Sequence, residues 1–313
     1  MRKIIADAHS DVVEYAYDNK MDICDRRLSF NLMDVQVSTP YLQLMACFVH
    51  DKYKGKGYDR VERITEYYKG QEAKYAENIT RINNSKDINK LREKGKVGVM
   101  LTVENGVAID GNIENLYELN KHGIRMMTIT WDYDNQLASG NLTNNDMGLT
   151  GFGKRCIKTM NSLNMIVDVS HASTKTFWDI INMSSKPIIA SHSNVYNLCK
   201  HNRNLTDIQI KEISKLNGII GITYYNAFLS NNKHTCINDV VNHIEYISNL
   251  VGVEHVCLGS DFDGIDKKEL PDKLKGVKDI YKLKECLENR GFSKVEIEKI
   301  MGENLVSFIQ SNI

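Results

Sequence analysis

Short apolar runs alternate with amphipathic segments along most of this chain. Apolar residues recur at helical spacing in several of the intervening segments, for example over 113–121, 150–163, 206–216 and 237–251. Strands that alternate with helices in this way predict βα units and a parallel sheet. Eight runs have the length and composition of buried strands: 3–9, 42–48, 97–103, 124–130, 165–169, 187–191, 218–223 and 256–259.

Five of these runs end on residue types that bind metal ions. A buried parallel strand is apolar on both faces, and polar groups become tolerable where the strand meets its βα loop. In a closed (β/α)8 barrel all strand ends form one rim, and the active sites of that fold lie there. We therefore predict an α/β protein, a (β/α)8 TIM-type barrel, with a metal site at the C-terminal rim of the strands. The candidate ligands are His9, Asp11, Glu104, His171, His192 and Asp261.

A chain of 313 residues fits one barrel with insertions. We expect a single (β/α)8 barrel domain over residues 1–313, with a helical insertion near 52–89. The charged segment 59–82 has the pattern of a long amphipathic helix, bent near Gly70. Such a helix packs outside the barrel, or it covers the rim or forms an oligomer contact; the sequence leaves both interpretations open.

Charge and cysteine content narrow the classes of partner. The chain has 40 basic and 40 acidic residues, interspersed, so no global field attracts nucleic acid or anionic lipid. Seven scattered cysteines without paired spacing fit a reducing compartment. The first apolar run is broken by Asp7, and no run approaches the ~20 apolar residues that span a bilayer. We expect a cytoplasmic protein with neither nucleic acid nor membrane as partner.

The candidate ligands favour a particular metal. His9 and Asp11 alternate in an extended segment, so both side chains point the same way. Glu104 leaves a buried strand, where an unpaired charge is costly. Its partner is either a barrel Arg or Lys, or two metal ions that share the carboxylate. Nitrogen and carboxylate ligands without thiolates suit Zn²⁺ best, with Mn²⁺, Co²⁺ or Fe²⁺ as substitutes, and predict a binuclear zinc site.

A resemblance to a known family rests on longer stretches. DAHSD, TVENG, GLTGFGK, MIVDVSHAS, PIIASHSNVYNLCKHNRN, LGSDFDG and MGENL occur in this order along nearly the whole chain. With them the chain resembles the membrane (renal) dipeptidase family of zinc metallopeptidases, within the amidohydrolase-like barrels. The resemblance implies two Zn²⁺ per chain, one on His9 and Asp11, the other on His171 and His192, with Glu104 bridging. It also implies a metal-bridging water or hydroxide as nucleophile, Asp261 as the catalytic proton carrier, and a homodimer.

The resemblance also implies how substrate binds. Arg203 and Tyr225 match the family residues that bind the C-terminal carboxylate of a dipeptide, although Tyr224 allows a one-residue slip. Trp131 stands where better-known members carry a histidine that contacts the substrate near the developing oxyanion. Indole offers only an N–H donor, so that oxyanion would depend on the metal ions or on a neighbour such as Asn135.

The leading hypothesis is a zinc-dependent dipeptidase that hydrolyses the peptide bond of small dipeptides, because Arg203 and Tyr225 are retained. One alternative is a related amidohydrolase that acts on a lactone, a phosphotriester or another amide. The other is a non-catalytic, metal-containing protein that binds amino acids or dipeptides, which the change to Trp131 would favour.

Overall fold

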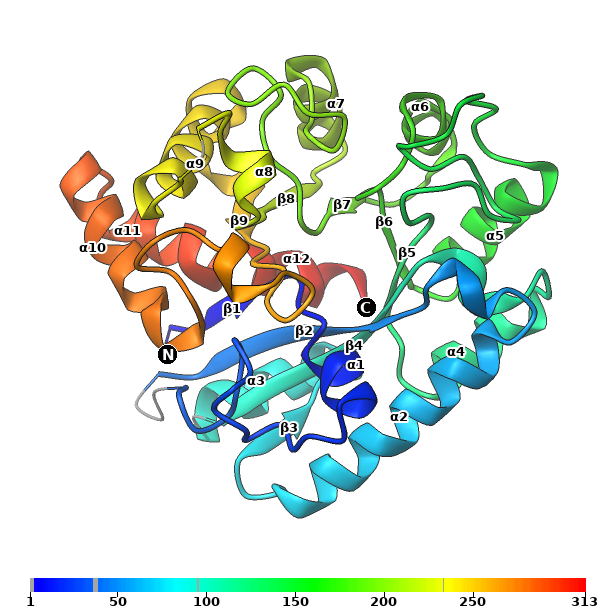
Figure 1. Ribbon diagram of the computed structural model, residues 1–313, viewed down its shortest axis with the longest axis horizontal. Coiled ribbons are helices and arrows are strands. Elements are labelled where there is room, and N and C mark those ends of the chain that lie inside the picture. The colour runs from blue at the N-terminus through cyan, green and yellow to red at the C-terminus, as the bar shows by residue number, and fades with distance from the viewer. Residues whose placement is uncertain (1–2, 36–38, 95, 233) are drawn as a thin grey trace.

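The computed structural model describes residues 3–35, 39–94, 96–232 and 234–313, and its centre is a closed parallel β-barrel (Figure 1). Each barrel strand pairs in parallel with its neighbours, and the β9–β1 and β2–β4 pairings complete the ring. The predicted (β/α)8 fold is confirmed. The barrel strands are β1 Ile5–Asp7, β2 Tyr41–Phe48, β4 Val97–Glu104, β5 Met126–Thr128, β6 Ile166–Asp168, β7 Ile189–Ala190, β8 Ile219–Ile222 and β9 Val256–Leu258.

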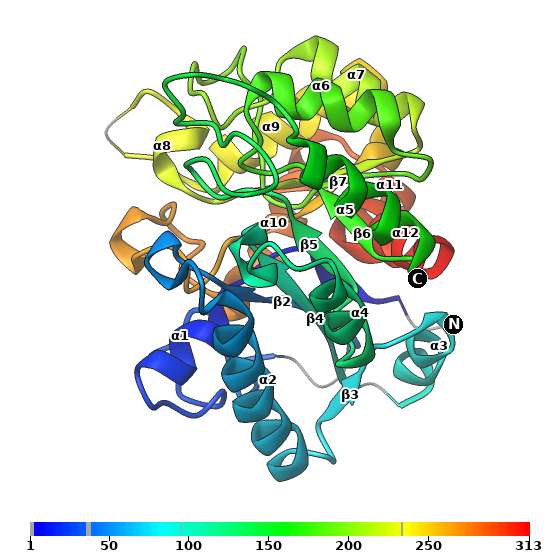
Figure 2. The same cartoon turned by 90° about the vertical axis from the view of Figure 1, so that its right-hand side faces the viewer.

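Helices surround the barrel in both views of the molecule (Figures 1 and 2). Thr206 and Ser293 each form a capping box, at the starts of α7 and α11. Within the described residues, no helix is long and apolar enough to cross a membrane. The helices are α1 Val12–Asp18, α2 Gly57–Lys74, α3 Ser85–Lys94, α4 Glu114–Lys121, α5 Gly151–Ser162, α6 Thr174–Met183, α7 Asp207–Lys215, α8 Asn226–Leu229, α9 Ile237–Val251, α10 Ile280–Arg290, α11 Lys294–Glu298 and α12 Asn304–Asn312.

The segment 52–89 differs from the predicted long helix. α2 ends at Lys74, without a break at Gly70, and a short strand, β3 Ile79–Arg81, follows it. β3 pairs with the first part of β4, whose last part pairs with β5 instead. In sequence, the helical pattern of α2 continues into residues 79–81. The backbone N–H and C=O groups along the first part of β4 need hydrogen-bond partners, however, and a strand at this position supplies them. α2 packs against α1 and β2, outside the barrel. That the segment is an insertion into one domain stays a prediction.

The two ends of the barrel have opposite character. Side chains alternate along a strand, so Met100 and Glu104 share the face of β4 that points into the barrel. Met100 belongs to an apolar cluster that Ile166, Ile219 and Leu305 of α12 also join, with no exposure above a few per cent. This apolar filling is the packed interior expected of the fold. Polar groups on inward faces therefore concentrate at the other end of the strands, where Glu104 lies.

Candidate metal centre

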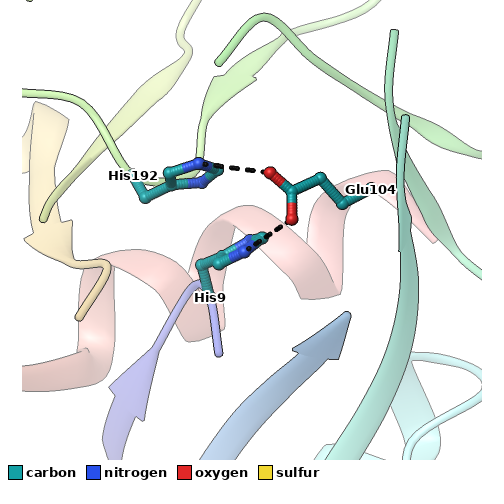
Figure 3. A group of neighbouring side chains, drawn as sticks. All are labelled: His9, Glu104 and His192. Carbon is teal, nitrogen blue, oxygen red and sulfur yellow. Dashed lines mark ion pairs between the residues drawn. The ribbon is translucent and has the colours of Figure 1, made fainter. Parts of the chain in front are cut away.

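The structure brings all six predicted ligand residues together at the C-terminal rim. They lie at or just after the ends of strands β1, β4, β6, β7 and β9, which are separated in sequence and end on the same rim of the closed barrel. Two sets of side chains place potential ligand atoms within 4.8 Å of one another: His9 with Glu104 and His192, and His9 with Asp11 and Asp261. Figure 3 shows the first set, in which both imidazoles face the Glu104 carboxylate.

Glu104 lies at the middle of the cluster, with one carboxylate oxygen toward each side of it. Oε2 lies 3.4 Å from His9 Nε2. Oε1 lies 2.9 Å from His171 Nε2 and 3.7 Å from His192 Nε2. Among the residues that the structure describes, the partners of this buried carboxylate are therefore imidazoles and not a barrel Arg or Lys. A carboxylate with its two oxygens divided in this way is suited to bridging two cations.

On one side of Glu104, His9 lies among carboxylates. His9 Nε2 is 3.5 Å from Asp11 Oδ2 and 3.9 Å from Asp261 Oδ1. Residue 264 is glycine, and a Cβ there would lie 2.1 Å from Asp11 Oδ2 and 2.6 Å from Asp261 Oδ1. The space beside the two carboxylates is therefore kept open by the absence of a side chain.

Several buried polar atoms on this side lack a partner. His9 is 1% exposed, yet neither of its ring nitrogens has a hydrogen-bond partner among the described residues, and the same holds for Asp11 Oδ1. A buried polar atom left unsatisfied costs about 1–3 kcal/mol. Imidazole nitrogens and carboxylate oxygens are the ligands that Zn²⁺ accepts. The residues present thus fit a metal ion at this position.

The charges of the cluster lead to the same conclusion. Burial would lower the pKa of His9, but the carboxylates of Asp11 and Glu104 outweigh burial and raise it. Burial would raise the pKa of Glu104, but His9 and His171 lower it well below its usual value. Burial and the charge of Glu104 raise the pKa of Asp11, and burial raises that of Asp261. The protonated forms of His9 and Asp11 are thus favoured, because buried carboxylates are concentrated around them, and a divalent cation would supply the compensating positive charge.

On the other side of Glu104, hydrogen bonds fix both imidazoles. The Nδ1 of His171 lies 3.0 Å from Asp132 Oδ1, and the Nδ1 of His192 lies 2.8 Å from Ser191 Oγ. Ser191 Oγ donates in turn to Asp168 Oδ2 at 2.6 Å. Metal-binding histidines usually donate their other N–H to such an acceptor. The sequence analysis did not identify these three supporting residues, although Asp168 interrupts an apolar run and so required a partner.

Two of the rim residues adopt unusual backbone conformations. His171 has φ 66° and Asp261 has φ 63°, in the left-handed region that residues other than glycine rarely occupy. Such conformations cost on the order of 1–3 kcal/mol and cluster at functional sites, where the surrounding structure maintains them. Two of the six candidate ligand residues thus have a strained backbone.

A cavity of about 620 Å³ opens beside the cluster, and Asp11, Glu104, His171 and Asp261 line it together with Phe48 and Trp131. The Trp131 ring lies 5.2 Å from that of Phe48 and 6.3 Å from that of His171, centroid to centroid. Trp131 therefore forms an aromatic wall next to the candidate ligands. The structure supports the prediction that it lies where substrate would bind, while its role stays a prediction.

Asn135 does not have the role that the sequence analysis considered for it. Both N–H groups of its amide are engaged, donating to Oδ1 of Asn105, which follows β4, and to the carbonyl of Ile129, which follows β5. Its oxygen accepts from the backbone of Leu137 and Ala138. An amide with both donors engaged cannot stabilise an oxyanion, so this expectation is wrong.

Arg203 is a buried cation without a carboxylate partner. It is 5% exposed, its Nε has no hydrogen-bond partner, and no ion pair to it occurs among the described residues. Nη2 donates to the His192 carbonyl at 3.3 Å, which places the guanidinium beside a candidate ligand. Burying an unpaired charge is expensive unless an anion compensates it. The position is suited to an anionic group of a ligand.

Tyr225 shares a neighbour with Arg203. The Tyr225 ring lies 4.7 Å from that of Phe228, over which the Arg203 guanidinium also lies, at 5.5 Å. Tyr224 is fully buried and packs against Phe262 instead. The structure therefore favours Tyr225 over Tyr224 as the tyrosine that accompanies Arg203.

Comparison with known proteins adds independent information. A sequence profile described as "Membrane dipeptidase (Peptidase family M19)" matches residues 1–311. A curated relative, an uncharacterized protein in the pqqA 5' region of Klebsiella pneumoniae, is 33% identical over 235 residues, which is 72% of this chain and 86% of that protein. The similarity thus extends over most of both chains.

Solved structures share the fold. A dipeptidase described as dipeptidase AC has a TM-score of 0.92 at 20% identity, covering 100% of this chain and 99% of that chain. A metallo peptidase from Rhodobacter sphaeroides, solved with a phosphinate mimic of the dipeptide L-Ala-D-Ala, has a TM-score of 0.90 at 19% identity, covering 100% of both. At these identities the structures establish a common architecture.

Proposed function

The chain belongs to the membrane dipeptidase family of metal-dependent hydrolases, and we propose that it cleaves the peptide bond of small dipeptides with two zinc ions at the rim cluster. The observation that carries the proposal is the position of Glu104, with one oxygen toward His9 and the other toward His171 and His192. One carboxylate between two ligand sets is what a binuclear site requires.

Five residues would hold the two ions in this proposal. His9 and Asp11 bind one ion, His171 and His192 bind the other, and Glu104 is shared. The unpartnered ring nitrogens of His9 and the unpartnered Oδ1 of Asp11 support the assignment on the first side. Bound zinc supplies Lewis acidity, which polarises a carbonyl and eases the deprotonation of water near neutral pH.

Asp261 is proposed to move the proton. Its Oδ1 lies 3.9 Å from His9 Nε2, at the edge of the cluster and on the wall of the cavity. Burial raises the pKa of this carboxyl above its usual value, which makes it a better proton acceptor. It can take a proton from the attacking water at Oδ1 and deliver it to the departing amine, as general base and then general acid.

Arg203 and Tyr225 are proposed to bind the free carboxylate of the dipeptide. A planar guanidinium suits a carboxylate, and the buried Arg203 has no such partner within the described part of the chain. Trp131 and Phe48 form the apolar wall of the substrate cavity. The buried cation favours a substrate with a free carboxylate over a lactone or a phosphotriester, and family membership favours turnover over binding alone.

A cytoplasmic location and a homodimer complete the proposal. All seven cysteines are free, which is typical of proteins in a reducing compartment. The homodimer rests on the family resemblance, and the mass of the protein in solution tests it.

The first test is metal content by elemental analysis of the purified protein, combined with hydrolysis of a mixed dipeptide panel before and after chelation. We expect about two zinc ions per chain, cleavage that chelation abolishes, and recovery when zinc is restored. Two ions without cleavage would keep the site but contradict the dipeptide substrate and direct attention to Trp131. Absence of metal would overturn the ligand assignment.

A further inference from the structure

A buried chain of three side chains ends at His192. Asp168 lies at the end of β6, and Ser191 and His192 follow β7. Ser191 Oγ lies 2.6 Å from Asp168 Oδ2 and 2.8 Å from His192 Nδ1. All three residues are 1% exposed or less, so solvent does not compete for these hydrogen bonds.

The groups around Asp168 determine which atom donates in each hydrogen bond of this series. Its Oδ1 accepts from the backbone N–H groups of Ser170 and Ser191, both at 3.0 Å. Its Oδ2 accepts from the hydroxyls of Thr128 and Ser191, at 2.7 and 2.6 Å. Because four donors surround the carboxylate, Asp168 serves only as an acceptor, and the hydroxyl hydrogen of Ser191 points toward it.

The direction of the hydrogen bond from Ser191 to Asp168 determines which ring nitrogen of His192 carries the hydrogen. With its hydrogen on Asp168, the Ser191 hydroxyl offers His192 only a lone pair, so Nδ1 of His192 must carry the ring hydrogen. The other nitrogen, Nε2, then keeps its lone pair. It lies 3.7 Å from Glu104 Oε1 and 2.9 Å from His171 Nε2, at the centre of the cluster. A metal ligand requires a free lone pair at this atom.

We propose that Asp168 and Ser191 are positioning residues, which hold His192 in the tautomer and orientation that leave Nε2 free to bind metal. The inference rests on the proposed function, since it takes His192 as a metal ligand. Neither Asp168 nor Ser191 touches the reacting atoms, and Asp168 acts only through Ser191.

A similar carboxylate elsewhere in the barrel lacks this role. Asp7 at the end of β1 accepts from the backbone N–H groups of His9 and Ser260, much as Asp168 does from its own neighbours. No hydroxyl links Asp7 to an imidazole, and His9 Nδ1 has no hydrogen-bond partner among the described residues. A carboxylate at the end of a strand is therefore enough to hydrogen-bond the backbones of neighbouring segments, as Asp7 does. Of these two carboxylates, only Asp168 is also linked through a serine hydroxyl to an imidazole, that of His192.

The chain offers a matched pair of variants on either side of His192. Ser191→Ala removes the relay, whereas Ser193→Ala removes a hydroxyl that is also buried but, among the described residues, reaches only Ser170 Oγ, at 3.5 Å. Asp168→Asn is the third variant. Its amide N–H would donate to Ser191, which would then donate to Nδ1 and move the ring hydrogen to Nε2.

Two measurements test the proposal. Zinc affinity is measured by competition with a chelator, and the histidine tautomers of the metal-free protein are read from ¹⁵N NMR. We expect Ser191→Ala and Asp168→Asn to weaken one of the two zinc sites by about 10- to 100-fold, the usual effect of losing such an outer hydrogen bond. Ser193→Ala should bind both ions as the wild type does. The NMR spectrum should show Nδ1–H at His192 in the wild type and a changed state in the other two variants.

The outcomes separate the two proposals. If the wild type binds two ions, but Ser191→Ala and Asp168→Asn bind them equally well with an unchanged tautomer, the relay is wrong and the dipeptidase proposal stands. If the wild type binds no zinc, the proposed function fails. The tautomer spectra then still decide whether the relay sets His192. Should Asp168→Asn fail to fold, Ser191→Ala against Ser193→Ala gives the same decision.

Discussion

The two sides of Glu104 are built on different principles. The β1/β9 side, formed by His9, Asp11 and Asp261, has two carboxylates and one imidazole, and the ring nitrogens of His9 have no hydrogen-bond partners within the described residues. The β6/β7 side, formed by His171 and His192, has two imidazoles whose Nδ1 atoms are both hydrogen-bonded. One side thus concentrates negative charge, and the other fixes geometry.

This difference indicates what each side needs from its ion. On the β1/β9 side, stacking orients His9, whose ring lies 3.9 Å from that of His192, and a cation would relieve the repulsion between the carboxylates. On the β6/β7 side both ligands are imidazoles that hydrogen bonds already orient, so an ion gains a prepared geometry. Metal binding should therefore be governed by charge on one side and by hydrogen bonding on the other.

The largest effect should come from the residue that serves both sides. Glu104→Gln replaces one carboxylate oxygen with an N–H₂ donor, which faces either His9 or the His171 and His192 pair. Lewis-acid stabilisation is worth several kcal/mol, so we expect kcat/KM to fall by about 10³-fold or more, with loss of bound zinc. Steady-state kinetics and metal analysis measure this. Glu118→Gln, at a half-buried surface glutamate that pairs with Lys121, is the control, and a Glu104→Gln protein that keeps two ions and near-normal activity would contradict the bridging role.

A substitution of Asp261 tests the proposed proton carrier on the β1/β9 side. Asp261→Asn keeps the size of the side chain but removes its capacity to accept a proton. General acid and base catalysis contributes roughly 10²- to 10⁴-fold, and we expect kcat to fall by that amount while zinc content stays near the wild-type value. The rim residue Asp266, which is paired with Lys268, provides the control Asp266→Asn. If Asp261→Asn instead lost an ion with its activity, Asp261 would be a ligand and not the proton carrier.

Arg203 tests the β6/β7 side, because its Nη2 donates to the His192 carbonyl. Losing a buried charge pair costs about 2–5 kcal/mol, so Arg203→Ala should reduce kcat/KM on dipeptides by roughly 30- to 5000-fold, mostly through KM. Dipeptide amides, which lack the free carboxylate, form the matched substrate series and should be cleaved equally by both proteins. Unchanged kcat/KM for dipeptides in Arg203→Ala would favour the lactone or phosphotriester alternative.

The sequence predicts the β1/β9 side better than the β6/β7 side, for a physical reason. His9 and Asp11 are neighbours in sequence and Asp261 ends an apolar run, so local patterns identify them. The support of His171 comes from Asp132, in a loop whose path is set by tertiary packing. Ligands at strand ends can be read from periodicity, whereas hydrogen bonds between loops require the fold.

The same reasoning applies to the fold. All eight barrel strands are predicted, because each is a separate apolar run, though most are shorter in the structure than in the prediction. β3 is missed because 75–82 continues the helical pattern of α2, and only the free part of the β4 edge makes it a strand. Asn135 is misjudged because its amide donates to Asn105, after the end of β4, and to the Ile129 carbonyl, and only the fold brings Asn105 and Asn135 together.

The smallest effect should concern stability, on the β6/β7 side. His243 is buried between two segments: its Nδ1 accepts from the Val195 N–H and its Nε2–H donates to the Leu229 carbonyl. Burial lowers the pKa of His243 to about 4. The unfolded chain therefore binds a proton more readily than the folded one, and the stability that neutral His243 contributes is complete above pH 6.5 and lost as the pH falls through 4.

The pKa difference corresponds to at most about 3 kcal/mol in the free energy of unfolding. His243→Gln cannot titrate, so its stability should change less than that of the wild type between pH 6.5 and 4. Urea unfolding of both proteins across this range measures the difference, with the exposed His234→Gln as control. Parallel curves for wild type and His243→Gln would show that His243 accepts a proton in the folded state. The hydrogen bond from Val195 would then be lost, because a protonated Nδ1 has no lone pair to accept it, and the loop that follows His192 would be held by its other hydrogen bonds, such as that from Asn194 to the Thr223 carbonyl.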